Sequence, residues 1–125
     1  MSILKKILSR SISKVKCKTL DEYQELAKTT SVYPDKCGDF YSFLGLPGEV
    51  GELLNRVKKV HRDRDGNFNE EDLLYIKKEL GDILWYLSDI SSMFELSLSD
   101  VAETNLEKLL LRKDNNTIKG DKRSE

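Results

Sequence analysis

The chain has 125 residues and a mass of 14.4 kDa, which predicts one domain with a real hydrophobic core and leaves no room for a second. Charged residues make up 34% of it and the formal net charge is −1, so no overall field draws the chain to nucleic acid or to an anionic membrane. Two cysteines in no metal-ligand spacing favour a reduced, cytoplasmic setting, and no apolar run reaches the roughly 20 residues that a membrane span needs.

The first eighteen residues differ from the rest of the chain. They contain only basic charges, and apolar residues recur among them at helical spacing. This pattern fits a helix that packs on the domain, a loose extension, an organelle transit peptide or a surface-membrane helix. We expect a packing helix or a loose extension, with organellar targeting as the minor alternative and no membrane contact.

Two helices are predicted in the first half of the domain. Thr19 and Glu22 have capping-box spacing and open a helix over residues 19–30. A connector with helix breakers follows, and apolar periodicity predicts a second helix over residues 43–61. Pro47 falls in the first turns of that helix, where proline is tolerated.

The second half of the domain predicts two further helices. A polar loop with an Asp-Gly turn precedes Asn69, a good N-cap for a long helix over residues 70–94. Ser99 is the predicted N-cap of a fourth helix over residues 99–112. The fold class is therefore all-α, a four-helix bundle. The predicted division is a basic N-terminal extension over residues 1–18, a helical domain over residues 19–113 and a polar tail over residues 114–125.

Two pairs of carboxylates interrupt the apolar faces of the second and third predicted helices. Glu49 and Glu52 are three residues apart, as are Glu79 and Asp82, so each pair lies within one helical turn. In both helices the first acid lies at the edge of the apolar face and the second about 60° further out. Because the connecting loop is short, the two helices should pack antiparallel and bring the four carboxylates together.

A cluster of four acids is costly unless something positive lies among them, although solvated helix faces also carry such residues. Oxygen ligands suit Mg²⁺, with Mn²⁺ as the alternative. The first pair is set among small residues, Gly48 and Gly51, that allow close approach. A ferritin-like di-iron bundle would need Glu-x-x-His pairs, and His61 belongs to none, so we interpret it as a surface or helix-end residue.

Three stretches of the chain resemble a known family. The stretches "GLPGEVGELLNRVKK", "KKELGDILWYLSDI" and "LSLSDVAETNLEKLLLRK" are similar to the MazG-like nucleotide pyrophosphohydrolases of the all-α NTP pyrophosphatase superfamily. The family motif, E-E-x-x-E followed by E-x-x-D, is matched by the two acid pairs. The sequence departs from the fuller form at Gly48, where the motif has another glutamate.

The resemblance implies Mg²⁺-dependent cleavage of a nucleoside triphosphate, (d)NTP, to (d)NMP and pyrophosphate, as housekeeping of the nucleotide pool. It implies that Glu49, Glu52, Glu79 and Asp82 are the catalytic and metal-binding residues. Basic and polar residues near the motifs are the candidates for contacts with phosphate, sugar or base, although each is also explained as a solvated or packed residue of a helix. These candidate substrate-binding residues are Lys59, Tyr86, Asn105, Lys108 and Arg112.

Assembly and function have alternatives at this stage. A wide apolar surface on the long third helix predicts a homodimer or a homotetramer. No nucleic-acid partner is expected beyond the nucleotide substrate. The competing functions are a non-catalytic helical interaction module and an adaptor that uses the basic N-terminal segment.

Overall fold

The computed structural model describes residues 15–33 and 40–116. Within these residues it contains α-helices and no strand, which confirms the all-α prediction. Most of the predicted N-terminal extension and of the polar tail lies outside the described residues. No helix among the described residues is long and apolar enough to cross a membrane. The helices are α2 (Leu20–Lys28), α3 (Phe40–Arg64), α4 (Glu70–Met93) and α5 (Leu98–Asp114).

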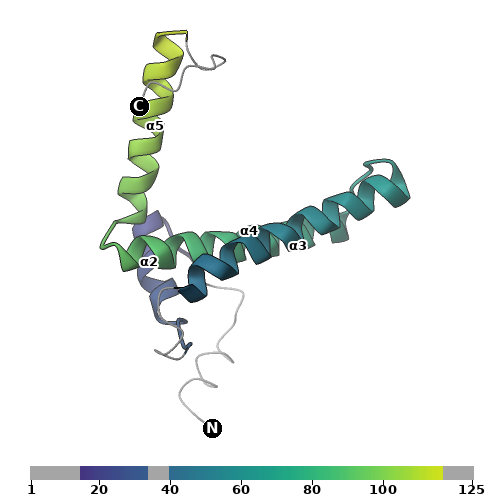
Figure 1. Ribbon diagram of the computed structural model, residues 1–125, viewed down its shortest axis with the longest axis horizontal. Coiled ribbons are helices and arrows are strands. Elements are labelled where there is room, and N and C mark those ends of the chain that lie inside the picture. The colour runs from purple at the N-terminus through teal and green to yellow at the C-terminus, as the bar shows by residue number, and fades with distance from the viewer. Residues whose placement is uncertain (1–14, 34–39, 117–125) are drawn as a thin grey trace.

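The centre of the molecule is an antiparallel hairpin of α3 and α4 (Figure 1). The short α2 packs against α4 at the end of the hairpin opposite the α3–α4 loop. The last helix, α5, starts at that same end and projects away from the hairpin (Figure 1). It contacts α2 and α4 through its beginning, so most of its length has no packing partner among the described helices.

Side-chain caps start α2 and α4 where the sequence predicts them. The Thr19 side chain accepts a hydrogen bond from the Glu22 backbone N–H, while the Glu22 carboxylate reaches back to the N–H of Lys18. Asn69 caps α4 in a complete capping box, in which its side chain accepts from the Asp72 N–H and the Asp72 carboxylate accepts from the Asn69 N–H. These bonds satisfy backbone donors that a helix start leaves without partners.

The hairpin loop and the start of α5 test two further predictions. Asp65 and Gly66 both have positive φ, at 54° and 78°, which confirms the predicted Asp-Gly turn. The prediction of Ser99 as the N-cap of α5 is wrong, because Ser97 is the cap and accepts from the Asp100 N–H. The local sequence fits either serine as the N-cap. Tertiary contacts with α2 determine that the cap is Ser97.

Those contacts come from two side chains of α2. Gln24 is buried, donates to the Ser92 hydroxyl and the Leu96 carbonyl, and accepts from the Leu98 N–H at 2.8 Å. Asp21 accepts from the Ser97 hydroxyl at 2.8 Å. Since Leu98 is itself buried at the first position of α5, α2 fixes both the start and the direction of this helix.

The second predicted helix is longer than expected. It was predicted over residues 43–61, and α3 runs from Phe40 to Arg64. Pro47 therefore lies in the third turn rather than the first, and it removes one backbone hydrogen bond there. His61 lies in the last turn, edge-on to Phe68 at a ring-centroid distance of 6.1 Å, as the interpretation of a helix-end residue expects.

Candidate functional site

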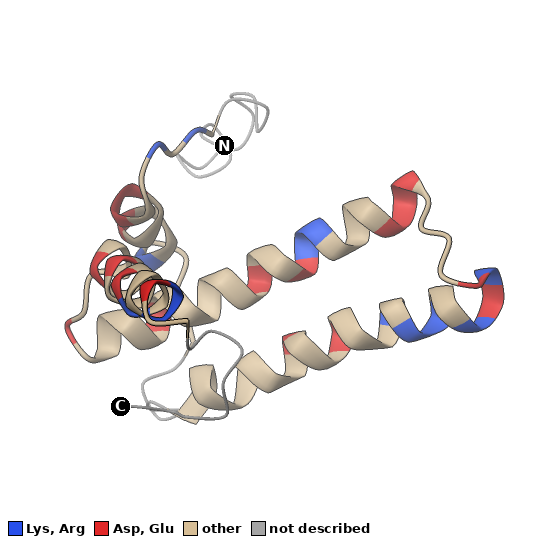
Figure 2. Cartoon of the chain, turned by 90° about the horizontal axis from the view of Figure 1, so that it is seen from above, with Lys and Arg blue, Asp and Glu red and all other residues tan. Residues whose placement is uncertain are grey.

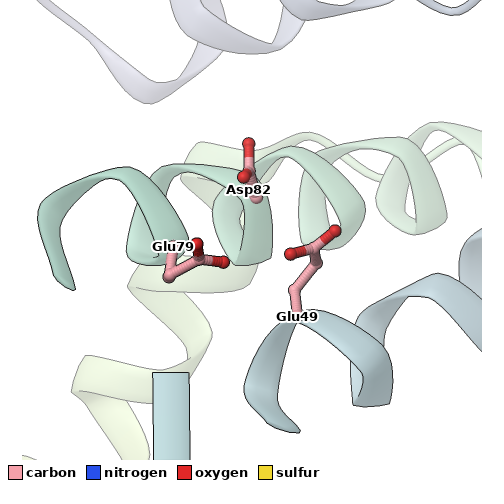
Figure 3. Close-up of side chains that lie close together, drawn as sticks. All are labelled: Glu49, Glu79 and Asp82. Atoms are coloured by element: carbon pink, nitrogen blue, oxygen red, sulfur yellow. The ribbon is translucent and has the colours of Figure 1, made fainter. Parts of the chain in front are cut away.

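Three carboxylates meet across the seam between α3 and α4. Glu49 comes from α3, and Glu79 and Asp82 come from α4, with one oxygen of each within 4.8 Å of the others (Figure 3). The first two are half-buried and Asp82 is exposed. In Figure 3 the Glu49 and Glu79 side chains lie between the helices, while Asp82 points towards a neighbouring segment. The hairpin thus brings three of the four predicted acids together.

The fourth predicted acid lies apart from this group. Glu52 is exposed, one turn along α3 from Glu49, and its carboxylate faces the hydroxyl of Tyr75 at 3.4 Å. Its negative charge still acts on Glu49, although it is the weakest of the influences there. We therefore describe the site as a carboxylate cluster of Glu49, Glu79 and Asp82 with Glu52 at its margin.

The cluster gathers negative charge, and none of the ion pairs found among residues 15–33 and 40–116 involves its three acids. Partial burial raises the pKa of Glu49 first, followed by a hydrogen bond with Glu79 and the negative charges of Asp82, Glu79 and Glu52. Within the described residues, the ion pairs of Lys28, Arg56, Arg62 and Arg64 all go to carboxylates outside the cluster. Carboxylate oxygens are the donor set that Mg²⁺ and Mn²⁺ prefer.

Three tyrosines surround the cluster, and the sequence analysis identified only one of them. The pKa of each is raised, chiefly by burial and then by nearby groups that include the acids: Asp82 for Tyr23, Glu79 for Tyr75, and Asp82 with Glu49 for Tyr86. Tyr75 stands four residues before Glu79, one turn away on the same face of α4, so helical spacing would have found it. Tyr23 comes from α2, and no sequence signal places it there.

Tyr86, a predicted substrate-binding residue, lies beside the cluster in close contact with α3. A methyl group built on Gly45 would come within 2.3 Å of the Tyr86 ring, so only glycine lets the ring lie where it does. In contrast, a methyl group at Gly48 or Gly51 would meet nothing within 4 Å in the described chain. The chain thus leaves open space beside Gly48 and Gly51, and Gly45 is the glycine of α3 that another side chain approaches closely.

An aromatic pocket of about 450 Å³ opens next to Tyr86. The rings of Tyr33 and Tyr41 stack at 4.3 Å, and Trp85 packs edge-on to Tyr86 at 5.1 Å. The Trp85 indole N–H donates to the Thr30 hydroxyl at 2.7 Å, which fixes the ring against the end of α2. These five residues, with Val32, line the pocket.

The other predicted substrate-binding residues do not approach the cluster within one chain. Lys59 is ten residues beyond Glu49 on α3, about 15 Å along the helix, and lines a shallow pocket with Asp63 near the hairpin loop. The remaining three, Asn105, Lys108 and Arg112, lie on α5, which projects away from the hairpin (Figure 1).

One comparison with known proteins identifies a family, and a second finds a relative. Residues 43–117 match the family model of the MazG nucleotide pyrophosphohydrolase domain. The Gene 37 protein of Mycobacterium phage L5 is 40% identical over 108 residues, which cover 81% of this chain and 94% of that protein. No solved structure matches the chain.

Proposed function

The chain belongs to the MazG nucleotide pyrophosphohydrolase family, and from that premise we propose that it is a Mg²⁺-dependent hydrolase of nucleoside triphosphates. The proposed products are a nucleoside monophosphate and pyrophosphate. The observation that carries the proposal is the meeting of Glu49, Glu79 and Asp82 within 4.8 Å, across two helices, in a chain of this family. The protein would thereby remove unwanted nucleotides from the nucleotide pool. We propose the cytoplasm as its location, because its two cysteines favour a reducing compartment.

The proposed reaction breaks one phosphoanhydride bond. A water oxygen attacks the α-phosphorus, the bond from that phosphorus to the bridging oxygen breaks, and pyrophosphate leaves. A divalent cation held by the cluster would neutralise phosphate charge and lower the pKa of the attacking water. The chain's own acids would hold that cation, and one of them would take the proton from the water.

We propose that the base of the nucleotide lies in the aromatic pocket. The pocket adjoins the cluster through Tyr86, so a substrate can place its phosphates on the acids and its base among the rings. Stacking on aromatic rings suits any base and gives modest selectivity. We expect Tyr41→Ala to raise KM several-fold and to change kcat little, as loss of a stacking surface predicts.

A homodimer is the assembly that the exposed surface supports. Along the side of α4 away from Asp82, apolar residues recur every seven positions over about 31 Å and stay half-exposed. Exposed apolar residues of α3 lie alongside and extend this row. Phe43 of α3 contacts Phe94 edge-on, at a ring-centroid distance of 6.3 Å. Contiguous exposed apolar side chains of this kind are typical of protein–protein contact surfaces, and a second copy of the chain would cover them. The members of this apolar patch are Phe43, Val50, Leu54, Leu73, Leu80, Leu87 and Phe94.

A second copy of the chain would also explain how the predicted substrate-binding residues of α5 could reach a carboxylate cluster. In one chain, α5 projects into solvent and carries exposed leucines, so an assembled protein must cover them. We propose that Asn105, Lys108 and Arg112 contact the substrate in the assembly, with Lys59 at its margin. If Lys108 serves the partner's cluster, mixing Lys108→Gln with Asp82→Asn protein should restore part of the activity that each variant lacks. No recovery on mixing would place Lys108 with its own cluster or outside the site.

The test of function is the release of pyrophosphate from a panel of NTPs and dNTPs, with and without Mg²⁺. We expect monophosphate and pyrophosphate in equal amounts, only with the metal, and none from Glu79→Gln. Glu70→Gln, a change of the same kind at the exposed start of α4, should retain full activity. Release of inorganic phosphate alone, or equal rates in Glu79→Gln, would contradict the proposal. A dimer without any hydrolysis would support the interaction module instead.

The test of assembly is light scattering. The parent should have twice the monomer mass of 14.4 kDa, or four times it. Leu87→Glu, in the centre of the apolar patch, should give monomers, because a charge would be buried at the interface. Leu26→Glu, an equally exposed leucine on α2, should not change the mass. A monomeric parent at micromolar concentration would contradict the dimer.

A further inference from the structure

Tyr75 lies beside the carboxylate cluster but belongs to none of the motifs that identify the family. Its hydroxyl is 3.4 Å from the nearer Glu52 oxygen, and it also lies within reach of Glu79. Among the described residues, it is the one non-acidic side chain that hydrogen-bonds to any of the four motif acids. The neutral hydroxyl therefore sits between a carboxylate of α3 and one of α4.

The position of this hydroxyl is set by the end of the hairpin. The Arg56 guanidinium lies over the Tyr75 ring, 4.7 Å from its centroid. Arg56 is held in turn by Asp72, to which its Nε donates at 3.1 Å. Because Asp72 is buried in the capping box of α4, the guanidinium that lies on the Tyr75 ring is itself held in place.

We propose that Tyr75 is a positioning residue for the candidate metal site: its hydroxyl donates to Glu52 and holds that carboxylate beside Glu79, ready to be the fourth oxygen ligand of a divalent cation. This inference rests on the proposed function, because it needs a cation at the cluster. It goes beyond it by assigning a role to a residue outside the motif acids. Without the hydroxyl, Glu52 is an exposed side chain that must give up its rotational freedom when it binds the cation.

The expected effect is moderate. Loss of a hydrogen-bond partner of a metal ligand lowers metal affinity by about 10- to 100-fold. The distance of 3.4 Å is long for an O–H···O bond, and the pair is exposed, so the low end applies. We therefore expect a loss of about fivefold to tenfold.

The experiment measures Mn²⁺ and Mg²⁺ affinity by calorimetry on the full chain without nucleotide. Tyr75→Phe keeps the ring under Arg56 and removes only the hydroxyl, so it should bind both metals about fivefold to tenfold more weakly. Tyr75→His, which keeps a ring and a donor, should recover part of that affinity. The control is Ser92→Ala, which removes a hydroxyl that accepts from Gln24 at 3.0 Å away from the cluster and should bind metal like the parent.

A double-mutant cycle separates positioning from general structural support. In a Glu52→Gln background, Tyr75→Phe should cause no further loss, because the carboxylate that it positions is gone. Equal metal affinities of the parent and Tyr75→Phe would overturn the inference. It would also be overturned if the losses of metal affinity in Tyr75→Phe and Glu52→Gln were additive in the double variant. A parent that binds neither metal would refute the proposed metal site itself, whereas normal binding by the parent and by Tyr75→Phe would refute only the role of Tyr75.

Discussion

The two halves of the α3/α4 hairpin hold acids in opposite surroundings. Near the loop, Asp72 is 2% exposed, and its carboxylate is bound by Arg56, Arg64 and the backbone N–H of Asn69. Along α3 the basic residues gather towards this loop, and acidic residues follow further from it (Figure 2). Both oxygens of the buried acid accept hydrogen bonds, and the two arginines balance its charge.

In the middle of the hairpin the acids are grouped instead of paired. Glu49, Glu79 and Asp82 approach one another within 4.8 Å, and the pKa of Glu49 is raised by its burial and by these neighbours. A fold does not need this arrangement, since like charges repel and solvent screens them only in part. This difference separates Asp72, which stabilises the fold, from the acids of the cluster, which are available to a ligand. Removing Asp72 should destabilise the chain, and removing an acid of the cluster should not.

The largest effect should come from Asp72→Ala. The change leaves two arginines without their shared acid and breaks the capping box, so we expect the free energy of unfolding to fall by about 2–4 kcal/mol. The midpoint of thermal unfolding should drop by roughly 10 °C. The measurement is calorimetry without metal, with Asp63→Ala as the matched control, because the Arg62–Asp63 pair is exposed. Equal shifts in the two variants would erase the contrast between the halves.

A smaller effect of opposite sign is expected from Asp82→Asn. The substitution keeps the shape of the side chain and removes one charge of the cluster, so the metal-free protein should melt at the same temperature or a few degrees higher. Added Mg²⁺ should raise the melting temperature of the parent and do so much less for the variant. Hydrolysis should be lost. If the variant melts markedly lower without metal, Asp82 belongs with Asp72 among the acids that support the fold.

Several features of the fold and of the site could be predicted from the sequence. The caps at Thr19 and Asn69, the Asp-Gly turn and the existence of four helices follow from local chemistry, and the structure has them all. The approach of Glu49 to Glu79 and Asp82 follows from helical spacing and one short loop. The caps and the turn depend on residues near one another in the chain, and the approach of the acids depends only on two regular helices joined by a short loop.

What the sequence did not predict depends on contacts between distant residues. The start of α5 at Ser97 is fixed by Asp21 and Gln24 of α2, more than seventy residues earlier. The need for Gly45 arises only because the Tyr86 ring lies against it. Similarly, Glu52 meets the Tyr75 hydroxyl across the seam between α3 and α4, a contact that the spacing of the acids does not predict. Periodicity gives the face of a helix, but it does not say which partner across the seam a side chain meets.

The smallest expected effect is a pH dependence that distinguishes the grouped acids from the paired one. The pKa of Glu49 is raised above its ordinary value of 4.5, first by burial and then by Glu79 and Asp82. A group with a higher pKa in the folded chain binds more protons when folded. Its contribution to stability is therefore present at low pH and is lost as the pH rises from 4.5 through the raised value.

Glu49→Gln removes that titration, so the comparison is the melting temperature of the parent minus that of the variant between pH 4 and pH 7. Without metal this difference should fall as the pH rises, by about 1–2 °C, because Glu49 is only half-buried and solvent screens part of the effect. With saturating Mg²⁺ the difference should rise with pH instead, since a cation binds only the ionised carboxylate and stabilises the parent alone. Glu70→Gln is the control. The difference in melting temperature between the parent and this variant should not change with pH, either with or without Mg²⁺. A difference that rises with pH in the absence of metal would mean that Glu49 is stabilised in its charged form, as Asp72 is by its arginines. The two halves of the hairpin would then treat their acids alike, and the case for a cation site between them would be lost.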